Sequence, residues 1–327
     1  MRRRSWFVYT AILALVIPIT AAADMVGEGS FDRTLKVNGS VSLEVQTGSG
    51  SISLRKGTAG VVTIHARIRA AGGWFSGINA EEKVKRIVAN PPVEQTGNVI
   101  RIGRIEDPDL RNNVSISYEI TAPAETRADL RTGSGSQSIE AVQGPVQAQT
   151  GSGNIRAFDI DADGTFRSGS GNIELENIRH NLEASAGSGN IRAHNIGGSC
   201  KLSTGSGDVT LVQAGGGEVE VKAGSGTLRL ENIKGSLRAS NGSGHISADG
   251  EPSGTWEVRT GSGGISVRVP ANAAFDLYAH SSSSSINLGV PVTVEGTQNR
   301  HEVRGKVRGG GGFSLDLRSG SGDIDVR

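Results

Sequence analysis

The 327-residue chain has little of the material from which globular cores are built. Aromatic residues make up 4% of it, and there are nine prolines and a single cysteine, Cys200. One cysteine excludes an intramolecular disulfide framework. A rounded domain with so few large apolar side chains would have a thin core and marginal stability. The composition therefore favours an extended architecture that is stabilised by backbone hydrogen-bond ladders.

An excess of charge of one sign is also missing. The chain carries 34 basic and 33 acidic residues, and 31 basic residues remain when the three arginines at positions 2–4 are set aside. Proteins that bind nucleic acids rely on a dominant basic surface to neutralise phosphates. The near balance excludes such a surface, and we expect no nucleic-acid partner.

Long apolar runs are confined to the first residues of the chain. Three arginines precede an apolar stretch at residues 6–19, and three alanines follow at 21–23. This order predicts that residues 1–23 are a secretory signal, because a membrane span needs ~20 apolar residues. An uncleaved N-terminal anchor is the alternative. The mature chain is expected to have no transmembrane span and to be exported to the periplasm, the cell surface or the extracellular medium.

Glycine is abundant, with 48 residues, and much of it lies in Gly-Ser-Gly triplets that recur at steps of 18 or 19 residues. The regular triplets begin at Gly133, Gly151, Gly169, Gly187, Gly205, Gly224, Gly242 and Gly261, and further ones begin at Gly48 and Gly320. A fixed period near twenty residues, with one small structural unit per repeat, is typical of a solenoid.

Two apolar columns follow each triplet. The position four residues after the first glycine is occupied by Ile155, Ile173 and Ile191, and the position two residues further on by Ala157 and Leu175. A spacing of two is strand periodicity, so both columns are predicted to face inward from one strand. A similar apolar pair, five and three residues before most triplets, predicts a second inward-facing strand.

Two strands and two turns per repeat predict an all-β fold, a flattened two-sheet β-solenoid with coils of ~18 residues. Each coil should advance by about 4.8 Å, the spacing of neighbouring strands. A three-sided coil is the alternative, because Ile160, Ile178 and Ile196 form a third apolar column.

The outward positions support this register. Four residues before the triplets, charges alternate in sign along Glu183, Lys201, Glu220, Arg238 and Glu257. Opposite charges on neighbouring strands contribute roughly 0.2–1 kcal/mol per pair. A polar column eight residues after the first glycine contains Asn177, Asn195, Gln213 and Asn232. Stacked amides of this kind predict a hydrogen-bonded ladder.

The ends of the chain differ from its middle. Residues 24–60 are expected to form the first strands and coil, and residues 61–128 a strand–helix–strand insertion or cap. Its short amphipathic helix, at residues 80–89, is stopped by two prolines at 91–92. Residues 129–327 form the repeats, which degenerate from about 270 to 312. Nothing follows the intact final repeat, so Ile324 and Val326 are predicted to lie on an exposed edge strand that supports weak self-association.

Candidate chemistry is sparse. Asp159, Asp161 and Asp163 match the start of a calcium-binding loop, but the twelfth position, which should be a bidentate acid, is Ser170. An exposed acidic corner is the favoured interpretation. The triplet serines recur and so cannot be a unique nucleophile, and Cys200 falls on an inward column, which predicts a buried thiol. We expect no catalytic residues, no metal and no cofactor.

Several segments resemble the bacterial "putative adhesin" family of exported β-solenoid domains. The matching stretches are VSLEVQTGSGSISL, VVTIHARI, AEEKVKRIV, NVIRI and SYEITAPAETRADLRTGSGSQSI, and the likeness spans about residues 30–327. The resemblance implies a β-solenoid fold and a location in the cell envelope, and it lends no catalytic residues.

These observations predict a non-catalytic, adhesin-like scaffold or interaction surface in the cell envelope, whose partner would be an envelope protein or a glycan. A polysaccharide-binding or polysaccharide-cleaving β-helix is the alternative. A second alternative is a structural protein that self-assembles through the C-terminal edge strand.

Overall fold

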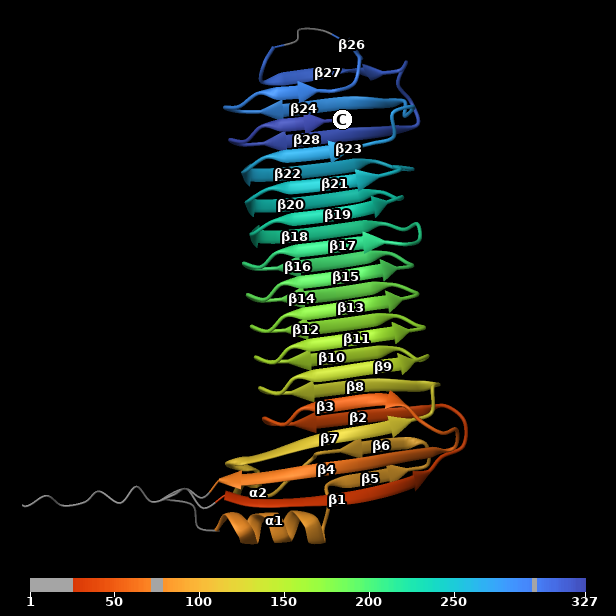
Figure 1. Cartoon of the computed structure of the whole chain (residues 1–327), viewed down its shortest axis with the longest axis vertical. Coiled ribbons are helices and arrows are strands. Elements are labelled where there is room, and N and C mark those ends of the chain that lie inside the picture. The colour runs from red at the N-terminus through yellow and green to blue at the C-terminus, as the bar shows by residue number, and fades with distance from the viewer. Residues whose placement is uncertain (1–25, 72–78, 296–298) are drawn as a thin grey trace, which may run out of the picture.

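The computed structural model describes residues 26–71, 79–295 and 299–327. It is a rod of stacked coils in which two long sheets lie back to back (Figure 1). The sheet with 14 strands is called sheet A, and the one with 15 strands is called sheet B. From β8 to β23, successive strands alternate between the two sheets and pair in parallel with the strand one coil away. The flattened two-sheet solenoid is therefore confirmed.

The regular coils occupy the middle of the rod. Those in sheet B are β8 (Thr126–Thr132), β10 (Val146–Thr150), β12 (Gly164–Ser168), β14 (Leu182–Ala186), β16 (Cys200–Thr204), β18 (Val219–Ser225), β20 (Leu237–Ser243) and β22 (Trp256–Ser262). Those in sheet A are β9 (Gln137–Val142), β11 (Ile155–Ile160), β13 (Ile173–Ile178), β15 (Ile191–Ile196), β17 (Val209–Gln213), β19 (Leu228–Ile233), β21 (Ile246–Gly250) and β23 (Ile265–Arg268).

The apolar columns form the core as the periodicity predicts. Ile155, Ile173 and Ile191 lie directly beside one another in the ladder and are at most 1% exposed. The third apolar column lies at the end of the same strands and does not build a third face. Its isoleucines turn inward because the residue before each one adopts a left-handed backbone, with φ near 58° at Asp159 and 57° at Asn177. Asparagine and aspartate tolerate this conformation better than most residues.

The N-terminal end is closed by antiparallel strands and a helix. In sheet A, β3 (Ile52–Lys56) is followed outward by β7 (Val114–Ala122), β4 (Val61–Ala71) and β1 (Val26–Lys36). In sheet B, β2 (Val41–Thr47) is followed by β6 (Val99–Ile102) and β5 (Val93–Thr96). Helix α1 (Ala80–Ala89) lies against β1 at the base of the rod, and the short α2 (Pro108–Arg111) precedes β7 (Figure 1).

Helix α1 is held by both its cap and its apolar face. The Asn79 side chain accepts a hydrogen bond from the backbone N–H of Glu82, which satisfies one of the free donors at the helix start. Val84 and Ile87 are buried. The helix packs closely against strand β1 at Gly29, where a Cβ atom would lie only 2.4 Å from Val84 Cγ1.

The C-terminal end corrects the sequence-based prediction of an exposed final strand. Its elements are β24 (Phe275–Ser281), β25 (Ile286–Leu288), β26 (Val292–Val294), β27 (Glu302–Val307), β28 (Phe313–Ser319) and β29 (Ile324–Val326). Strand β28 lies between β22 and β24, and β29 lies between β23 and β25. Ile324 pairs with Ile265 on one side and with Ile286 on the other.

The last two strands of the chain, β28 and β29, are therefore not at the end of the stack (Figure 1). They occupy the coil between β22/β23 and β24/β25, which precede them in the sequence. The chain reaches this coil through residues 309–312, four glycines that all have positive φ. The prediction that Ile324 and Val326 form a free edge was wrong, because both sides of β29 are already paired. Strand β29 therefore has no free edge to which a second chain could add a strand.

Candidate functional site

One edge of the rod is formed by the triplet turns, and side-chain hydrogen bonds join most of these turns to the neighbouring one. Thr204 Oγ1 donates to the carbonyl oxygen of Gly189 in the preceding coil (2.9 Å) and accepts from the N–H of Gly207 (3.1 Å). We call this pair of bonds the hydroxyl clasp. The same two bonds are made by Thr132, Thr150, Ser168 and Ser319.

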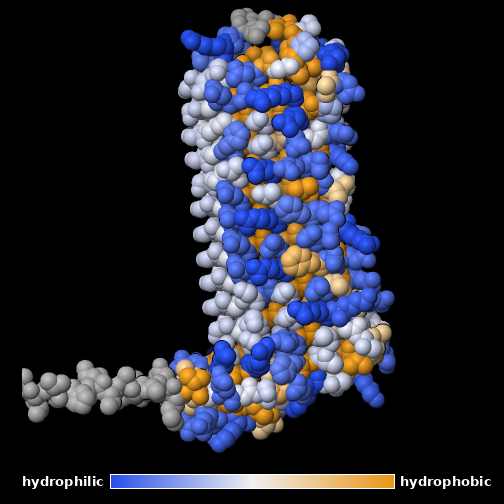
Figure 2. Space-filling view, in the orientation of Figure 1, coloured by the Kyte–Doolittle hydropathy of each residue, from blue (hydrophilic) through white to orange (hydrophobic). Residues whose placement is uncertain are grey.

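The hydroxyl clasp was not predicted from the sequence, although the sequence contains its signal. The residue directly before each triplet is a threonine or serine in most coils, and it is alanine in two of them, Ala186 and Ala223. Figure 2 shows the stacked triplet turns as a regular pale ridge along the side of the rod where the even-numbered strands end in Figure 1. The ridge presents small side chains and carries no charge at the triplets themselves.

The outward face of sheet B carries the predicted column of alternating charge. Glu183 pairs with Lys201, and the register continues through Glu220, Arg238 and Glu257. Arg238 Nε lies 3.4 Å from Glu257 Oε2. These carboxylates and cations are partly exposed, so each pair contributes little by itself.

A second column of cations lies two residues further along the same strands. Lys222, Arg259 and Arg318 each reach back to the carboxylate of their own strand, and Arg318 Nε lies 2.7 Å from Asp316 Oδ1. The hydrogen bond and charge of Lys222 hold the pKa of the Glu220 carboxyl below its usual range. Alternation ends where Asp316 lies beside Glu257.

Replacing Lys201 with glutamate tests this stacking. The change places three like charges in adjacent strands, with Glu183 and Glu220 on either side. Each new pair should cost several tenths of a kcal/mol, so the melting temperature should fall, and fall further at low salt. Thermal melts at two ionic strengths measure this. Lys201→Gln is the control and should have a smaller effect; a Lys201→Glu protein that melts like the parent at low salt would contradict the register.

The opposite edge carries an amide ladder over three coils. Asn177 Nδ2 donates to Asp159 Oδ1 (2.7 Å), and Asn195 Nδ2 donates to Asn177 Oδ1 (2.6 Å). The ladder was predicted to include Gln213, but β17 is one residue shorter at this point, and Gln213 turns inward beside Ile196 and is 2% exposed.

The three candidate calcium ligands do not converge. Asp159 accepts from Asn177, Asp161 pairs with Arg179 at 3.2 Å, and Asp163 Oδ1 accepts from the backbone N–H of Asn181 at 3.0 Å. Each carboxylate therefore stabilises the neighbouring coil. Within the described ranges, no group of three or more His, Cys, Asp or Glu residues is placed to hold a metal ion.

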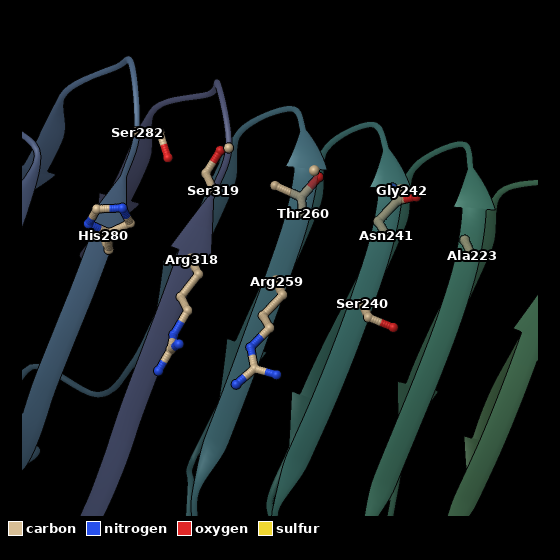
Figure 3. Close-up of a pocket in the computed structure, with 12 residues that line it drawn as sticks. Ala223, Ser240, Asn241, Gly242, Arg259, Thr260, His280, Ser282, Arg318 and Ser319 are labelled. Atoms are coloured by element: carbon tan, nitrogen blue, oxygen red, sulfur yellow. The ribbon is translucent and has the colours of Figure 1, made fainter.

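A shallow depression of about 490 Å³ lies on the outward face of sheet B beside the triplet turns, towards the C-terminal end of the rod. Four neighbouring strands supply its walls through Ser240, Arg259, Arg318 and His280, and Figure 3 shows the two arginines extended in parallel. Asn241 Oδ1 and His280 Nδ1 are buried and have no hydrogen-bond partner within the described part of the chain. These residues could not be grouped from the sequence, because the reversed order of the last strands places β28 beside β22 and β24 beside β28.

A family model described as Toastrack DUF4097 matches residues 159–327, just over half of the chain. The chain belongs to the Toastrack DUF4097 family. The match covers most of the regular coils and the whole C-terminal end, so it includes the depression. No curated protein sequence matches the chain.

Two solved structures resemble this Toastrack chain along most of its length. One is a "putative cell adhesion protein" from Clostridium sporogenes, which is 11% identical in sequence. The alignment covers 91% of this chain and 98% of the Clostridium chain, with a TM-score of 0.21. The other is a "putative adhesin" from Bacteroides fragilis, 13% identical, which covers 91% and 97%, with a TM-score of 0.33. In the described part of the Toastrack chain, no helix has the length and apolar character of a membrane span. The predicted signal at residues 1–23 lies outside the described residues.

The single thiol of this Toastrack protein is buried, as the sequence predicts. Cys200 is 3% exposed, and burial raises the pKa of its thiol to about 12. Because the thiolate is the reactive form, we expect no alkylation of the native protein at pH 8 and complete alkylation after unfolding. Mass spectrometry after iodoacetamide treatment measures both. Rapid labelling of the native protein would show that the coil at Cys200 opens.

Proposed function

We propose that the chain is exported and acts in the cell envelope as a non-catalytic interaction scaffold of the adhesin kind. The observation that carries this proposal is the use of its outward polar side chains. In the alternating charged column of sheet B, Arg238 pairs with Glu257 of the next coil, and the amides of the ladder also bond from coil to coil. The second column of cations pairs within its own strands. Groups that are engaged in such ladders stabilise the rod and present a long, regular surface to a partner.

The closest approach to a catalytic arrangement supports the same proposal. His65 Nδ1 lies 2.7 Å from Asp32 Oδ1 on the outward face of sheet A, which is the geometry of a histidine oriented by a carboxylate. The column continues from His65 to Glu119 and then to Ser53. Ser53 is therefore two strand spacings, about 10 Å, from the imidazole, which is beyond the reach of a general base. The pair links β1 to β4, and the serine in its column is too far away for the imidazole to activate it.

The first experiment tests export. The full chain is produced in a bacterial host, and cell fractions are analysed by immunoblotting and by intact mass. We expect the protein outside the cytoplasm, beginning at Asp24 after removal of residues 1–23. A variant that lacks residues 2–23 is the control and should remain in the cytoplasm. Retention of the full chain in the cytoplasm would contradict the proposal.

The second experiment separates binding from turnover. The exported chain is incubated with envelope polysaccharides and envelope proteins, and both retention on the rod and release of new ends are measured. We expect binding without cleavage. Cleavage that is lost in the His65→Ala variant would make the protein an enzyme and overturn the non-catalytic proposal.

A further inference from the structure

The depression on sheet B differs in composition from four other depressions on the described part of the rod. We call it the anion trough and define it by Ser240, Arg259, Arg318 and His280, with the turn glycines Gly242, Gly261 and Gly320 along its edge. Every described residue that lines it is uncharged or carries a basic side chain. Four other shallow depressions on the rod each contain at least two carboxylate side chains.

The basic groups are arranged by the sheet itself. Ser240 pairs with Arg259, Arg259 with Arg318, and Arg318 with His280, so the four side chains point outward in one row. Neighbouring strands are spaced by about 4.8 Å. The row therefore presents two guanidinium groups and an imidazole at regular intervals along the axis of the rod (Figure 3).

Both arginines are held in place and still have donors to offer. Arg318 uses Nε and Nη2 for Asp316, at 2.7 and 2.8 Å, and its guanidinium lies 5.1 Å from the centre of the Tyr278 ring. Arg259 uses Nη2 for Glu257. A guanidinium has five N–H donors in a fixed fork, so these pairs leave donors on each fork for a ligand. Fixing the side chains in advance reduces the entropy that binding must remove.

The trough also contains polar atoms that the protein does not satisfy. Asn241 is 5% exposed and stands in the column of hydroxyl clasps, where its Nδ2 donates to the carbonyl oxygen of Gly226 at 2.7 Å. Its Oδ1, like His280 Nδ1, is buried without a partner in the described structure. Buried polar atoms are rarely left in this condition. Rotation of either side chain towards the trough would bring its unpaired atom within reach of a ligand that carries hydroxyl groups.

The geometry points to an anionic polysaccharide, and we propose that the anion trough binds sugar units that carry carboxylate or sulfate groups. The acidic groups would contact Arg259 and Arg318, and the sugar hydroxyls would contact the serine, asparagine and histidine side chains. This inference rests on the proposed function and names the ligand class for one face of the scaffold.

A peptide strand and a nucleic acid fit the same surface less well. Strands β20, β22, β28 and β24 are each paired on both sides, so no free edge is available for an added strand. Single-stranded nucleic acids stack their bases on aromatic side chains. The aromatic ring nearest the row, Tyr278, is already covered by Arg318. A polymer that lies along the rod, with charged and hydroxyl groups, matches the row most closely.

The test uses the full mature chain and three named probes: polygalacturonate, dextran sulfate and uncharged dextran. Binding is measured by surface plasmon resonance at low and at physiological salt. We expect binding to one or both anionic polymers, weaker binding at higher salt and none to dextran. The ratio of the two anionic signals distinguishes a carboxylate ligand from a sulfate ligand.

Two sets of variants locate the site. Arg259→Gln/Arg318→Gln should weaken binding by about tenfold or more, because each charge-assisted bond contributes about 1.5–3 kcal/mol. Arg156→Gln/Arg192→Gln is the matched control on the outward face of sheet A and should bind like the parent. Ser240→Glu keeps both arginines and adds an acid to the row; it should also weaken binding, whereas Ser240→Gln should not.

The outcomes separate the two proposals. If folded Arg259→Gln/Arg318→Gln and Ser240→Glu proteins bind both anionic polymers like the parent, the anion trough is not the site. If the parent binds dextran or an envelope protein but neither anionic polymer, the trough inference fails and the scaffold proposal stands. If the exported chain binds no envelope component, both fail.

Discussion

Replacing Thr204 with valine is expected to lower the free energy of unfolding by about 2–6 kcal/mol, although the two side chains have nearly the same shape. The variant loses the hydroxyl that bonds Gly189 in one coil and Gly207 in the next. Both backbone groups would be left without that partner beside a side chain that is 5% exposed. Each buried group without a partner costs about 1–3 kcal/mol. The same change at an exposed threonine should have almost no effect.

Two matched variants define this prediction. Thr204→Ser keeps the hydroxyl and should retain most of the stability. Ala186→Ser places a hydroxyl in a coil whose alanine cannot form the clasp, and should stabilise the protein by about 0.5–1.5 kcal/mol. Because a solenoid can open locally, hydrogen exchange at the coils around Thr204 is the appropriate measurement, together with thermal melting. Equal protection in Thr204→Val and the parent would show that the clasp is not a stabilising contact.

The repeat period was sufficient to predict the architecture in this chain. Ile155, Ile173 and Ile191 recur at one offset, and a parallel stack is the arrangement that buries all three in one column. The alternating charges at Glu183 and Lys201 gave an independent check of the register. Both signals are local to the repeat, and for that reason they could be read without a structure.

The order of the last strands could not be predicted in this way. Each coil carries the same inward pattern, so Ile324 fits beside Ile265 as well as it would fit at the end of the stack. The pattern gives the register within a pair of coils and does not say which coils are neighbours. The anion trough depends on that order, since Arg318 reaches Arg259 and His280 only because β28 lies between β22 and β24.

The triplet was interpreted as a turn, and the structure adds a steric reason for its last glycine. A Cβ atom on Gly171 would lie 1.9 Å from the carbonyl oxygen of Gly153 and 2.4 Å from its carbonyl carbon. The same atom on Gly153, Gly189 or Gly207 would lie 1.9, 2.0 or 2.1 Å from the carbonyl oxygen one coil away. Stacking the turns at the spacing of paired strands therefore leaves no room for a side chain at this position.

Gly171→Ala is accordingly expected to lower the free energy of unfolding by at least about 4 kcal/mol, because the obstructing atoms are backbone and cannot rotate away. The coil of Gly171 would have to move away from the coil of Gly153, and the ladders between β10 and β12 and between β11 and β13 would lose hydrogen bonds. Gly216→Ala is the control: nothing lies within 4 Å of its Cβ position, and it should change stability by less than about 0.5 kcal/mol. Far-ultraviolet circular dichroism and hydrogen exchange should show lost protection around residue 171 and an unchanged Gly216→Ala protein. A Gly171→Ala protein that melts like the parent would mean that the coils are not stacked at this distance, and the contacts between neighbouring turns would have to be redrawn.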